Sequence, residues 1–340
     1  MNNSEYGGVP VQQSHAERVE LFVSNTQIIK KSFKWQHAMM QRLAALLYAA
    51  ENKTADGEAI HQSHELIKQN TKLFSAFRGN SAISIATMLS LTTDEDTKLA
   101  DTLHVYDLMK EIKFRNSDYL VIAAYQIATQ TSPDQFQPTV ERAKLFYDCM
   151  KAEHRFLTGQ DDYIFAAMLA LSDLEVDTGV ARMEQLYGEL KPEFSSRNSV
   201  QALTQVLVLG EDVPEAGARV IALNEAFRKR NLRMDKTYTL ASLGILSLLP
   251  SDRESLVDEV AETNDWLRTQ KGFGAWSIDK QELLLFSSAL VAIQYVEDLR
   301  NGALTTTIST SITNIIIAQQ AAMAAAAAAS AAAASSSSSN

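Results

Sequence analysis

A junction motif recurs along the whole chain and limits its possible folds more than any other feature. Each copy has a large apolar residue, a short polar turn, and a run of small and apolar residues, as in Phe77-Arg78-Gly79-Asn80-Ser81 followed by residues 82–91. The copies begin at Phe33, Phe77, Phe114, Leu157, Phe194, Leu232 and Phe273, which lie 37 to 44 residues apart. A period near this length is typical of arrays of two-helix units. The sequence therefore predicts seven consecutive helical hairpins.

Each hairpin pairs a charged, amphipathic helix with an apolar helix. We expect the charged helices at about 15–32, 58–74, 94–113, 137–154, 178–191, 213–230 and 252–270. We expect the apolar helices at about 38–50, 80–92, 117–130, 161–172, 198–209, 235–249 and 278–298. Helices that are apolar on all sides are buried, whereas amphipathic helices face water on one side. Because alternating Val, Ile and Thr runs are absent, no sheet is expected, and the predicted class is all-α.

Two arrangements of the hairpins fit the sequence, a closed α/α toroid and an open, curved α-solenoid. Open solenoids present polar faces on their terminal units, but the first and last apolar helices are as apolar as the middle ones. This pattern favours a closed ring or a C-terminal cap, and both arrangements stay open. The predicted organisation is a flexible arm over 1–14, a single αα-repeat domain over 15–300, and a tail over 301–340.

The tail over 301–340 carries no charged residue and is rich in Ile, Ala and Ser. Leu304, Ile308, Ile312 and Ile316 recur every four positions, and an alanine run follows. Because alanine is the best helix former, we expect a helix within 304–334. Its isoleucine stripe is expected to pack on the body or on a second copy. Ala, Ser, Thr and Gln dilute the hydrophobicity that a membrane span needs, so membrane contact by the tail is the weaker alternative.

Composition disfavours several classes of function and excludes some kinds of site. The net charge is −10 and the pI is about 5.2, which disfavours nucleic-acid binding and adhesion to anionic lipid. The single cysteine, Cys149, excludes an internal disulfide and a multi-cysteine metal site, and it fits a reducing cytoplasm. The N-terminus has neither the basic nor the apolar region of a signal peptide.

The polar junction residues are the candidate ligand-binding site. If the apolar helices lie side by side inside a ring, their N-termini share one rim, where backbone N–H groups and helix dipoles favour anionic or sugar-like ligands. The candidates are Trp35, His37, Arg78, Asn80, Asp118, Asp161, Asp162, Arg197, Asn198, Asp235 and Trp276. Two carboxylates on such a rim would also serve as acid and base. The simpler explanation is that Asn, Ser and Asp cap helices there. The recurrence of arginine beside asparagine goes beyond what capping needs.

No catalytic motif is present in the sequence. There is no phosphate-binding glycine loop and no nucleophile elbow, and Asp161-Asp162 lacks further metal ligands at regular spacing. We therefore expect no cofactor and no metal. The main hypothesis is a non-catalytic helical-repeat interaction or scaffold protein, with a protein partner or self-association through the tail. The alternative is a toroidal enzyme or small-ligand binder that uses the polar rim.

The junctions and the tail resemble one known family. The segments Phe77-Arg78-Gly79-Asn80-Ser81 and Ile315-Ile316-Ile317-Ala318-Gln319-Gln320, and the Asn-Ser-Asp-Tyr junction, are similar to the domain-of-unknown-function family numbered four thousand and three. The resemblance covers nearly the whole chain. It implies an all-helical cytoplasmic protein of Bacillus-like bacteria, and it implies no activity.

Overall fold

Consecutive helices pair along the chain in the computed structural model, which describes residues 11–79, 81–210 and 215–301. The pairs are α1 (Val11–Ser32) with α2 (Ala38–Ala50), α3 (Gly57–Asn70) with α4 (Ala82–Ser90), α5 (Glu95–Glu111) with α6 (Asp118–Gln130), α7 (Phe136–Glu153) with α8 (Tyr163–Leu171), α9 (Val176–Leu190) with α10 (Arg197–Leu209), α11 (Ala216–Lys229) with α12 (Leu240–Leu248), and α13 (Arg253–Thr269) with α14 (Lys280–Asn301). Short 3-10 turns, η1 (Ala76–Arg78) and η2 (Pro133–Gln135), precede α4 and α7. These ranges contain helices and no strand, so the all-α prediction is confirmed.

Helix caps explain why the predicted boundaries are close to the observed ones. Asp56, Asp94, Ser117, Ser196 and Asp252 each accept a hydrogen bond from a backbone N–H group in the first turn of the helix that follows. These N–H groups have no partner inside the helix, so a cap stabilises the start.

Three helices differ from the predicted ranges by four residues or more. α1 begins at Val11 rather than at residue 15, α3 ends at Asn70 rather than at 74, and α12 begins at Leu240 rather than near 235. The delay before α12 has a local cause, because Asp235 accepts hydrogen bonds from Arg228 and Arg233 at 2.9 Å and holds the preceding residues in a loop. The predicted tail helix lies outside the described residues.

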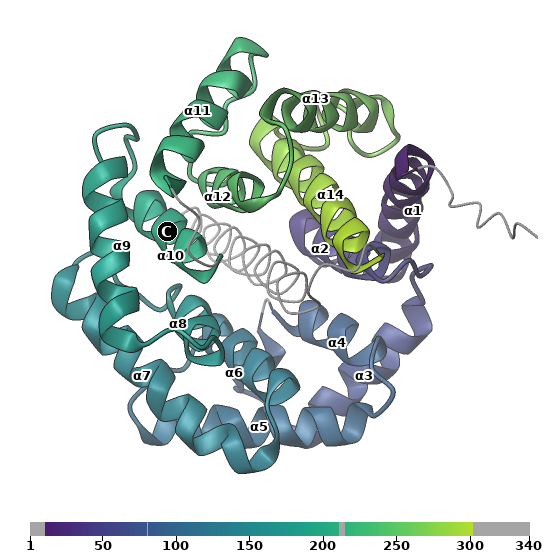
Figure 1. The fold of residues 1–340 in the computed structure, drawn as a ribbon. Helices are drawn as coiled ribbons and strands as arrows, with labels where there is room; N and C mark the ends of the chain where they lie inside the picture. The colour runs from purple at the N-terminus through teal and green to yellow at the C-terminus, as the bar shows by residue number, and fades with distance from the viewer. Residues whose placement is uncertain (1–10, 80, 211–214, 302–340) are drawn as a thin grey trace, which may run out of the picture.

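The even-numbered helices lie inside and the odd-numbered helices lie outside (Figure 1). Most residues of α2, α4, α6, α8, α10, α12 and α14 with a described side chain are buried, and most of the exceptions lie near the helix ends. The odd-numbered helices alternate buried and exposed positions, as the amphipathic pattern predicts. Small residues such as Gly244 allow close approach, since a Cβ at this position would overlap Leu203 of α10.

The first and last hairpins are neighbours. α1 packs against α13 and α14, and α2 packs against α14. The Phe22 ring lies 5.5 Å from the Phe273 ring and 5.4 Å from the Phe286 ring. Arg42 Nη1 donates to Glu282 Oε1 at 2.7 Å, with both side chains nearly buried. We call this contact between the first and last hairpins the seam.

Candidate functional site

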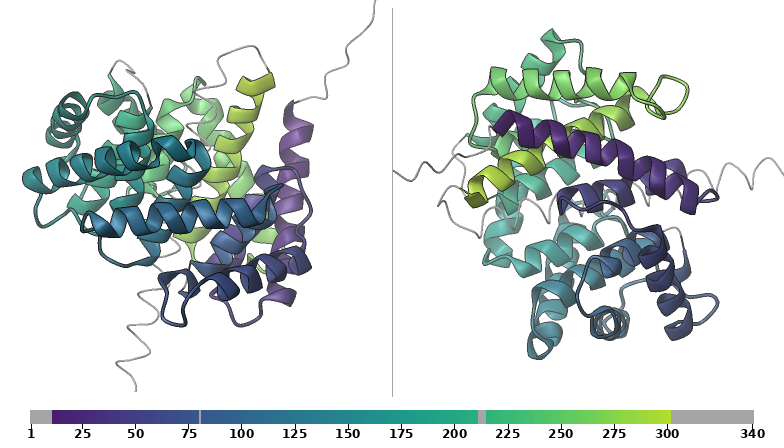
Figure 2. Two further views of the ribbon diagram at one scale, coloured as in Figure 1. Left: turned by 90° about the horizontal axis from the view of Figure 1, so that it is seen from below. Right: turned by 90° about the vertical axis from the view of Figure 1, so that its right-hand side faces the viewer.

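The seven loops that lead from an odd-numbered helix to the next even-numbered helix form the junction rim. They comprise residues 33–37, 71–79 with 81, 112–117, 154–162, 191–196, 230–239 and 270–279. Several neighbouring junctions are hydrogen-bonded: Ser81 Oγ donates to Asp118 Oδ1 at 3.0 Å, and Arg115 N donates to the Tyr163 hydroxyl at 3.2 Å. In the right panel of Figure 2, the α1–α2 and α13–α14 loops lie at the right edge, and α14 ends on the left. At the seam, the junction rim therefore lies at one end of the molecule.

The structure gives most of the predicted rim residues local partners. His37 Nδ1 accepts a hydrogen bond from the Met39 N–H at 3.4 Å and caps α2. Arg78 donates to the carbonyl oxygens of Lys68 and Thr71, which closes the end of α3. Asn80 lies outside the described residues.

Three of the predicted aspartates connect elements of the rim. Asp118 accepts from Ser81, and Gly79 allows this approach because a Cβ on Gly79 would overlap the Asp118 carboxylate. Asp161 accepts from Asn198 Nδ2 at 3.5 Å, across α8 and α10. Hydrogen bonds from Arg233 lower the pKa of Asp235 to about 2. These side chains are distributed around the rim, and the exposed Arg197 stands apart from them.

Asp162 is the most unusual ionisable group of the set. Its side chain is buried, with 5% of the residue exposed. Oδ2 accepts from the Gly159 N–H at 2.7 Å, and Oδ1 accepts from Gln205 Nε2 at 2.6 Å and from Gln201 Nε2 at 3.4 Å. Burial and the neighbouring Asp161 raise the pKa of Asp162 to about 7. The cluster joins the start of α8 to α10 and exchanges a proton near neutral pH.

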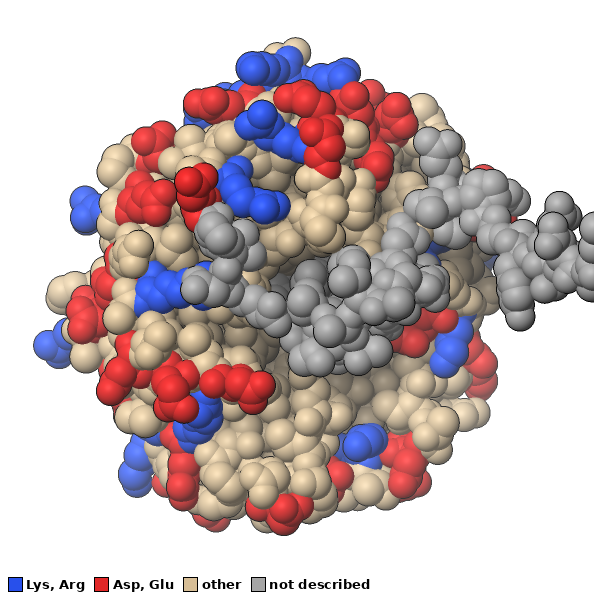
Figure 3. All heavy atoms as spheres, viewed as in Figure 1, with Lys and Arg blue, Asp and Glu red and all other residues tan. Residues whose placement is uncertain are grey.

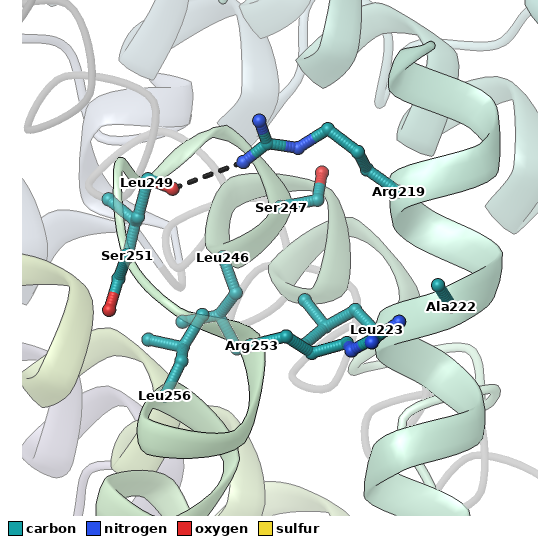
Figure 4. Close-up of a pocket in the computed structure, with 9 residues that line it drawn as sticks. All are labelled: Arg219, Ala222, Leu223, Leu246, Ser247, Leu249, Ser251, Arg253 and Leu256. Atoms are coloured by element: carbon teal, nitrogen blue, oxygen red, sulfur yellow. Dashed lines mark hydrogen bonds between the residues drawn. The ribbon is translucent and has the colours of Figure 1, made fainter.

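Two cavities lie elsewhere in the molecule. One, of about 290 Å³, lies among α11, α12 and α13 and is floored by leucines (Figure 4). Arg219 and Arg253 reach over it, and Arg219 donates to the Leu249 carbonyl oxygen at 3.2 Å. The other, of about 420 Å³, lies at the seam among α1, α13 and α14. None of the predicted rim residues lines either cavity.

Exposed aromatic side chains are the second feature of the junction rim. Trp35 is 99% exposed, Phe74 92%, Phe156 97% and Trp276 104%. Trp35 and Trp276 were predicted as site residues, whereas Phe74 and Phe156 were missed. The signal was available, because the lead phenylalanines of five junctions, such as Phe33 and Phe77, are buried, and the lead residues Leu157 and Leu232 are partly buried. A second aromatic residue, one to three positions from the lead residue in the same tight turn, then has no space in the core and is exposed.

Charge is segregated between the two ends of the hairpins. The junction rim contains eleven Lys and Arg residues and five Asp and Glu residues. The described loops that return from an even- to an odd-numbered helix, residues 51–56, 91–94, 131–135, 172–175, 210 with 215, and 249–252, contain one lysine and eight acidic residues. Acidic residues stabilise helix N-termini and basic residues stabilise C-termini. Because each odd-numbered helix ends at the junction rim, this local preference adds up to a basic rim.

In Figure 3 acidic and basic side chains are intermixed and lie mostly toward the periphery of the face in view. Within the described ranges, no set of three or more His, Cys, Asp or Glu side chains is placed to hold a metal ion. None of the helices in those ranges combines the length and hydrophobicity needed to traverse a bilayer.

Comparison with known proteins identifies the family. Residues 25–321 match the model of a family described as protein of unknown function, DUF4003. The match covers most of the 340 residues, and the chain therefore belongs to the DUF4003 family. No curated protein and no solved structure matches the chain.

Proposed function

We propose that the protein is a non-catalytic α/α-toroid scaffold that docks on an anionic lipid surface through part of its junction rim. The ring closure in this proposal is supported by the buried contacts of the seam, where α14 packs on both α1 and α2. The docking part is supported chiefly by one observation, the almost completely exposed Trp35 and Trp276 beside lysines in the two loops that meet at the seam.

The docking patch comprises the exposed side chains of the α13–α14, α1–α2 and α3–α4 loops and the helix ends beside them. Its apolar members are Trp276, Trp35, Leu73 and Phe74, and its basic members are Lys30, Lys31, Lys34, Lys72, Lys271 and Lys280. The α1 helix connects two of these loops, since Gln27 donates to the Lys271 carbonyl oxygen at 2.7 Å, and the Phe33 ring stacks on His61 in the first half of α3. Across these loops, Asp279 is the one described acidic residue.

This combination of side chains favours a bilayer over a protein partner. Tryptophan prefers the headgroup region of a membrane, and each lysine near an anionic surface contributes about 1 kcal/mol of attraction. The aromatic side chains project as separate tips, which a lipid interface accepts at any lateral position. A protein partner would need a matching pocket for each tip. The net charge of −10 opposes such binding, but the junction rim itself has more basic than acidic residues, whereas the return loops at the other end of the hairpins are acidic.

Vesicle sedimentation tests the proposal. The full chain is mixed with vesicles of phosphatidylcholine and phosphatidylglycerol, or of phosphatidylcholine alone, at low and high salt. We expect binding to the anionic vesicles that weakens with salt, because exposed charges are screened. Replacing both Trp35→Ser and Trp276→Ser should reduce binding about tenfold or more. Leu145→Ser, which changes an exposed leucine on α7, is the matched control.

Two outcomes would contradict the proposal. Equal binding to neutral and anionic vesicles would remove the role of the lysines. Equal binding by the double variant and the control would remove the role of the tryptophans. If the patch instead retains an acidic protein and no vesicles, the scaffold binds a protein partner, as the sequence first suggested. The alternative, a toroidal enzyme or small-ligand binder that uses the polar rim, has less support. Most of the described side chains of that rim cap helices or form hydrogen bonds to neighbouring elements.

A further inference from the structure

The cavity among α11, α12 and α13 shares no residue with the docking patch (Figure 4). Its volume is about 290 Å³, close to the roughly 300 Å³ at which binding sites for small organic ligands begin. Buried leucines form its floor and arginines lie at its edge: Leu223, Leu246, Leu249, Leu256, Arg219 and Arg253. No acidic residue is found among the described residues that line it. An apolar floor with a cationic edge suits an anion that carries a short apolar chain.

An earlier unit of the chain shows which part of this arrangement belongs to the fold. Arg142 of α7 donates to the Ser172 carbonyl oxygen at 3.1 Å, just as Arg219 of α11 donates to the Leu249 carbonyl oxygen at 3.2 Å. Both members of the first pair lie 77 positions before their counterparts in the second. The α7–α9 and α11–α13 units therefore share one register. In both, the arginine binds the C-cap residue of the even-numbered helix.

The side chains around this hydrogen bond differ between the two units. In the α7–α9 unit, Leu174 and Phe146 pack over Gly179, where a Cβ atom would lie 2.6 Å from Leu174 and 3.2 Å from Phe146. Their counterparts 77 positions later are, respectively, Ser251, Leu223 and Leu256. The leucine at the glycine position adds to the floor, but the serine and the other leucine are smaller than Leu174 and Phe146. The cavity therefore occupies space that larger side chains fill in the earlier unit.

Arg253 adds a second positive charge to this open space. Its counterpart 77 positions earlier is Val176, which is buried, whereas Arg253 is exposed and extends toward α11 (Figure 4). As the first residue of α13, Arg253 lies where the helix dipole disfavours a positive charge. Its Nε is 3.8 Å from the carboxylate of the exposed Glu254, which makes a weak ion pair. Its two terminal nitrogens donate to no residue in the described part of the chain and are accessible to a ligand.

We propose that this cavity binds a small alkyl carboxylate. The carboxylate would lie between the two guanidinium groups, and the alkyl chain would cover the leucine floor. Arg219 uses Nη2 for the Leu249 carbonyl oxygen, so its Nη1 remains for the ligand, and Arg253 offers both terminal nitrogens. Planar guanidinium groups match carboxylates, and charge-assisted hydrogen bonds are about twice as strong as neutral ones. Binding here does not depend on the proposed membrane docking, because the two sites share no side chain.

NMR titration of the full chain with hexanoate, read out by saturation transfer to the ligand, tests this proposal. Butyrate, hexan-1-ol and hexylamine serve as comparison probes with a shorter chain, no charge and the opposite charge. Each buried CH₂ group should tighten binding up to about fourfold, so butyrate should bind about tenfold weaker than hexanoate. Hexan-1-ol should also bind about tenfold weaker, because it forms no charge-assisted hydrogen bonds. Hexylamine should not bind.

Two kinds of substitution separate the charge from the cavity. Arg253→Gln should weaken hexanoate binding about fivefold or more. Arg230→Gln, which removes an arginine paired with Asp258 between the same two outer helices but outside the cavity, is the matched control and should not. Ser251→Leu and Leu223→Phe each introduce the residue of the earlier unit. Each should abolish hexanoate binding with both arginines still present, in a chain that circular dichroism shows to be folded.

Several outcomes would overturn the proposal. One is equal hexanoate affinity in the Arg253→Gln and Arg230→Gln variants. Another is unchanged hexanoate binding in a folded variant with the larger side chain at position 251 or 223. Hexylamine binding as tight as hexanoate would show that the arginines do not select the ligand. Absence of hexanoate binding to the wild-type chain would show that the cavity is not a carboxylate site.

Discussion

Replacing Asp162 by asparagine should stabilise the protein at alkaline pH. The Asp162 carboxyl is buried, and its pKa of about 7 lies above the value of 3.8 expected when the chain is unfolded. The folded state therefore binds a proton that the unfolded state releases between these two pH values. Stability from this group is fully present below about pH 4, falls as the pH rises to about 7, and then stays constant.

The size of the effect follows from the two pKa values. Each pKa unit corresponds to about 1.4 kcal/mol, so the rise from 3.8 to about 7 makes ionised Asp162 cost about 4 kcal/mol at pH 8. An asparagine side chain at this position would not ionise, and its amide oxygen could still accept from Gly159. Its NH₂ group could donate to the Oε1 atoms of Gln201 and Gln205, which are buried without partners. Losing the charge-assisted bond from Gln205 costs about 1–2 kcal/mol, which leaves a net gain of about 2 kcal/mol.

Urea denaturation of the wild type and Asp162→Asn at pH 5, 6, 7 and 8 measures this gain. The difference in free energy of unfolding should grow from pH 5 to pH 7 and then level off. Asp148→Asn, an exposed carboxylate on α7, is the control and should show no such dependence. A difference between the wild type and Asp162→Asn that is the same at pH 5 and pH 8 would refute the reasoning, because Asp162 would then not titrate in this range.

Three further substitutions test the packing of the seam and the rim. Arg42→Met should destabilise the fold by about 3–5 kcal/mol, because it leaves the largely buried Glu282 unpaired; adding Glu282→Gln should restore part of the loss in thermal unfolding. Gly79→Ala should cost about 1–3 kcal/mol in denaturant unfolding through overlap with the Asp118 carboxylate, and it should cost little when Asp118→Ala is also present. Ser117→Ala removes the cap of α6 and should cost about 1 kcal/mol, whereas Ser195→Ala, exposed and one position before the α10 cap, should be neutral.

Local signals in the sequence account for the helices. The caps, the apolar runs and the buried lead residues of the junctions are all short-range patterns, and the structure follows them to within a few residues in most hairpins. The late start of α12 is a case that these short-range patterns do not predict. The sequence suggests Asp235 as a helix cap, but ion pairs with Arg228 and Arg233, both earlier in the chain, hold it in the loop.

The contacts that connect the hairpins were not predictable in the same way. Arg42 and Glu282 are 240 positions apart, and nothing in either local sequence indicates the other. Asp118 was predicted as a candidate ligand-binding residue from its own junction, and nothing in that junction indicates that the hydroxyl of Ser81 in the preceding hairpin donates to it. The seam cavity was missed for the same reason, since the residues that line it come from α1 and from α13 and α14, at opposite ends of the chain. The periodicity of one sequence predicts which face of each helix is buried. It does not predict which distant helix packs on that face.

The two sides of the seam are synthesised at different times. With 240 positions between Arg42 and Glu282, and translation at roughly 5–20 residues per second, about 10–50 s pass between the two. During this interval Phe22 and Arg42 have no seam partner, and the first hairpin presents them to solvent or to a chaperone. Ribosome-bound chains shorter than about residue 290 should therefore be more sensitive to proteolysis at α1 than the released protein.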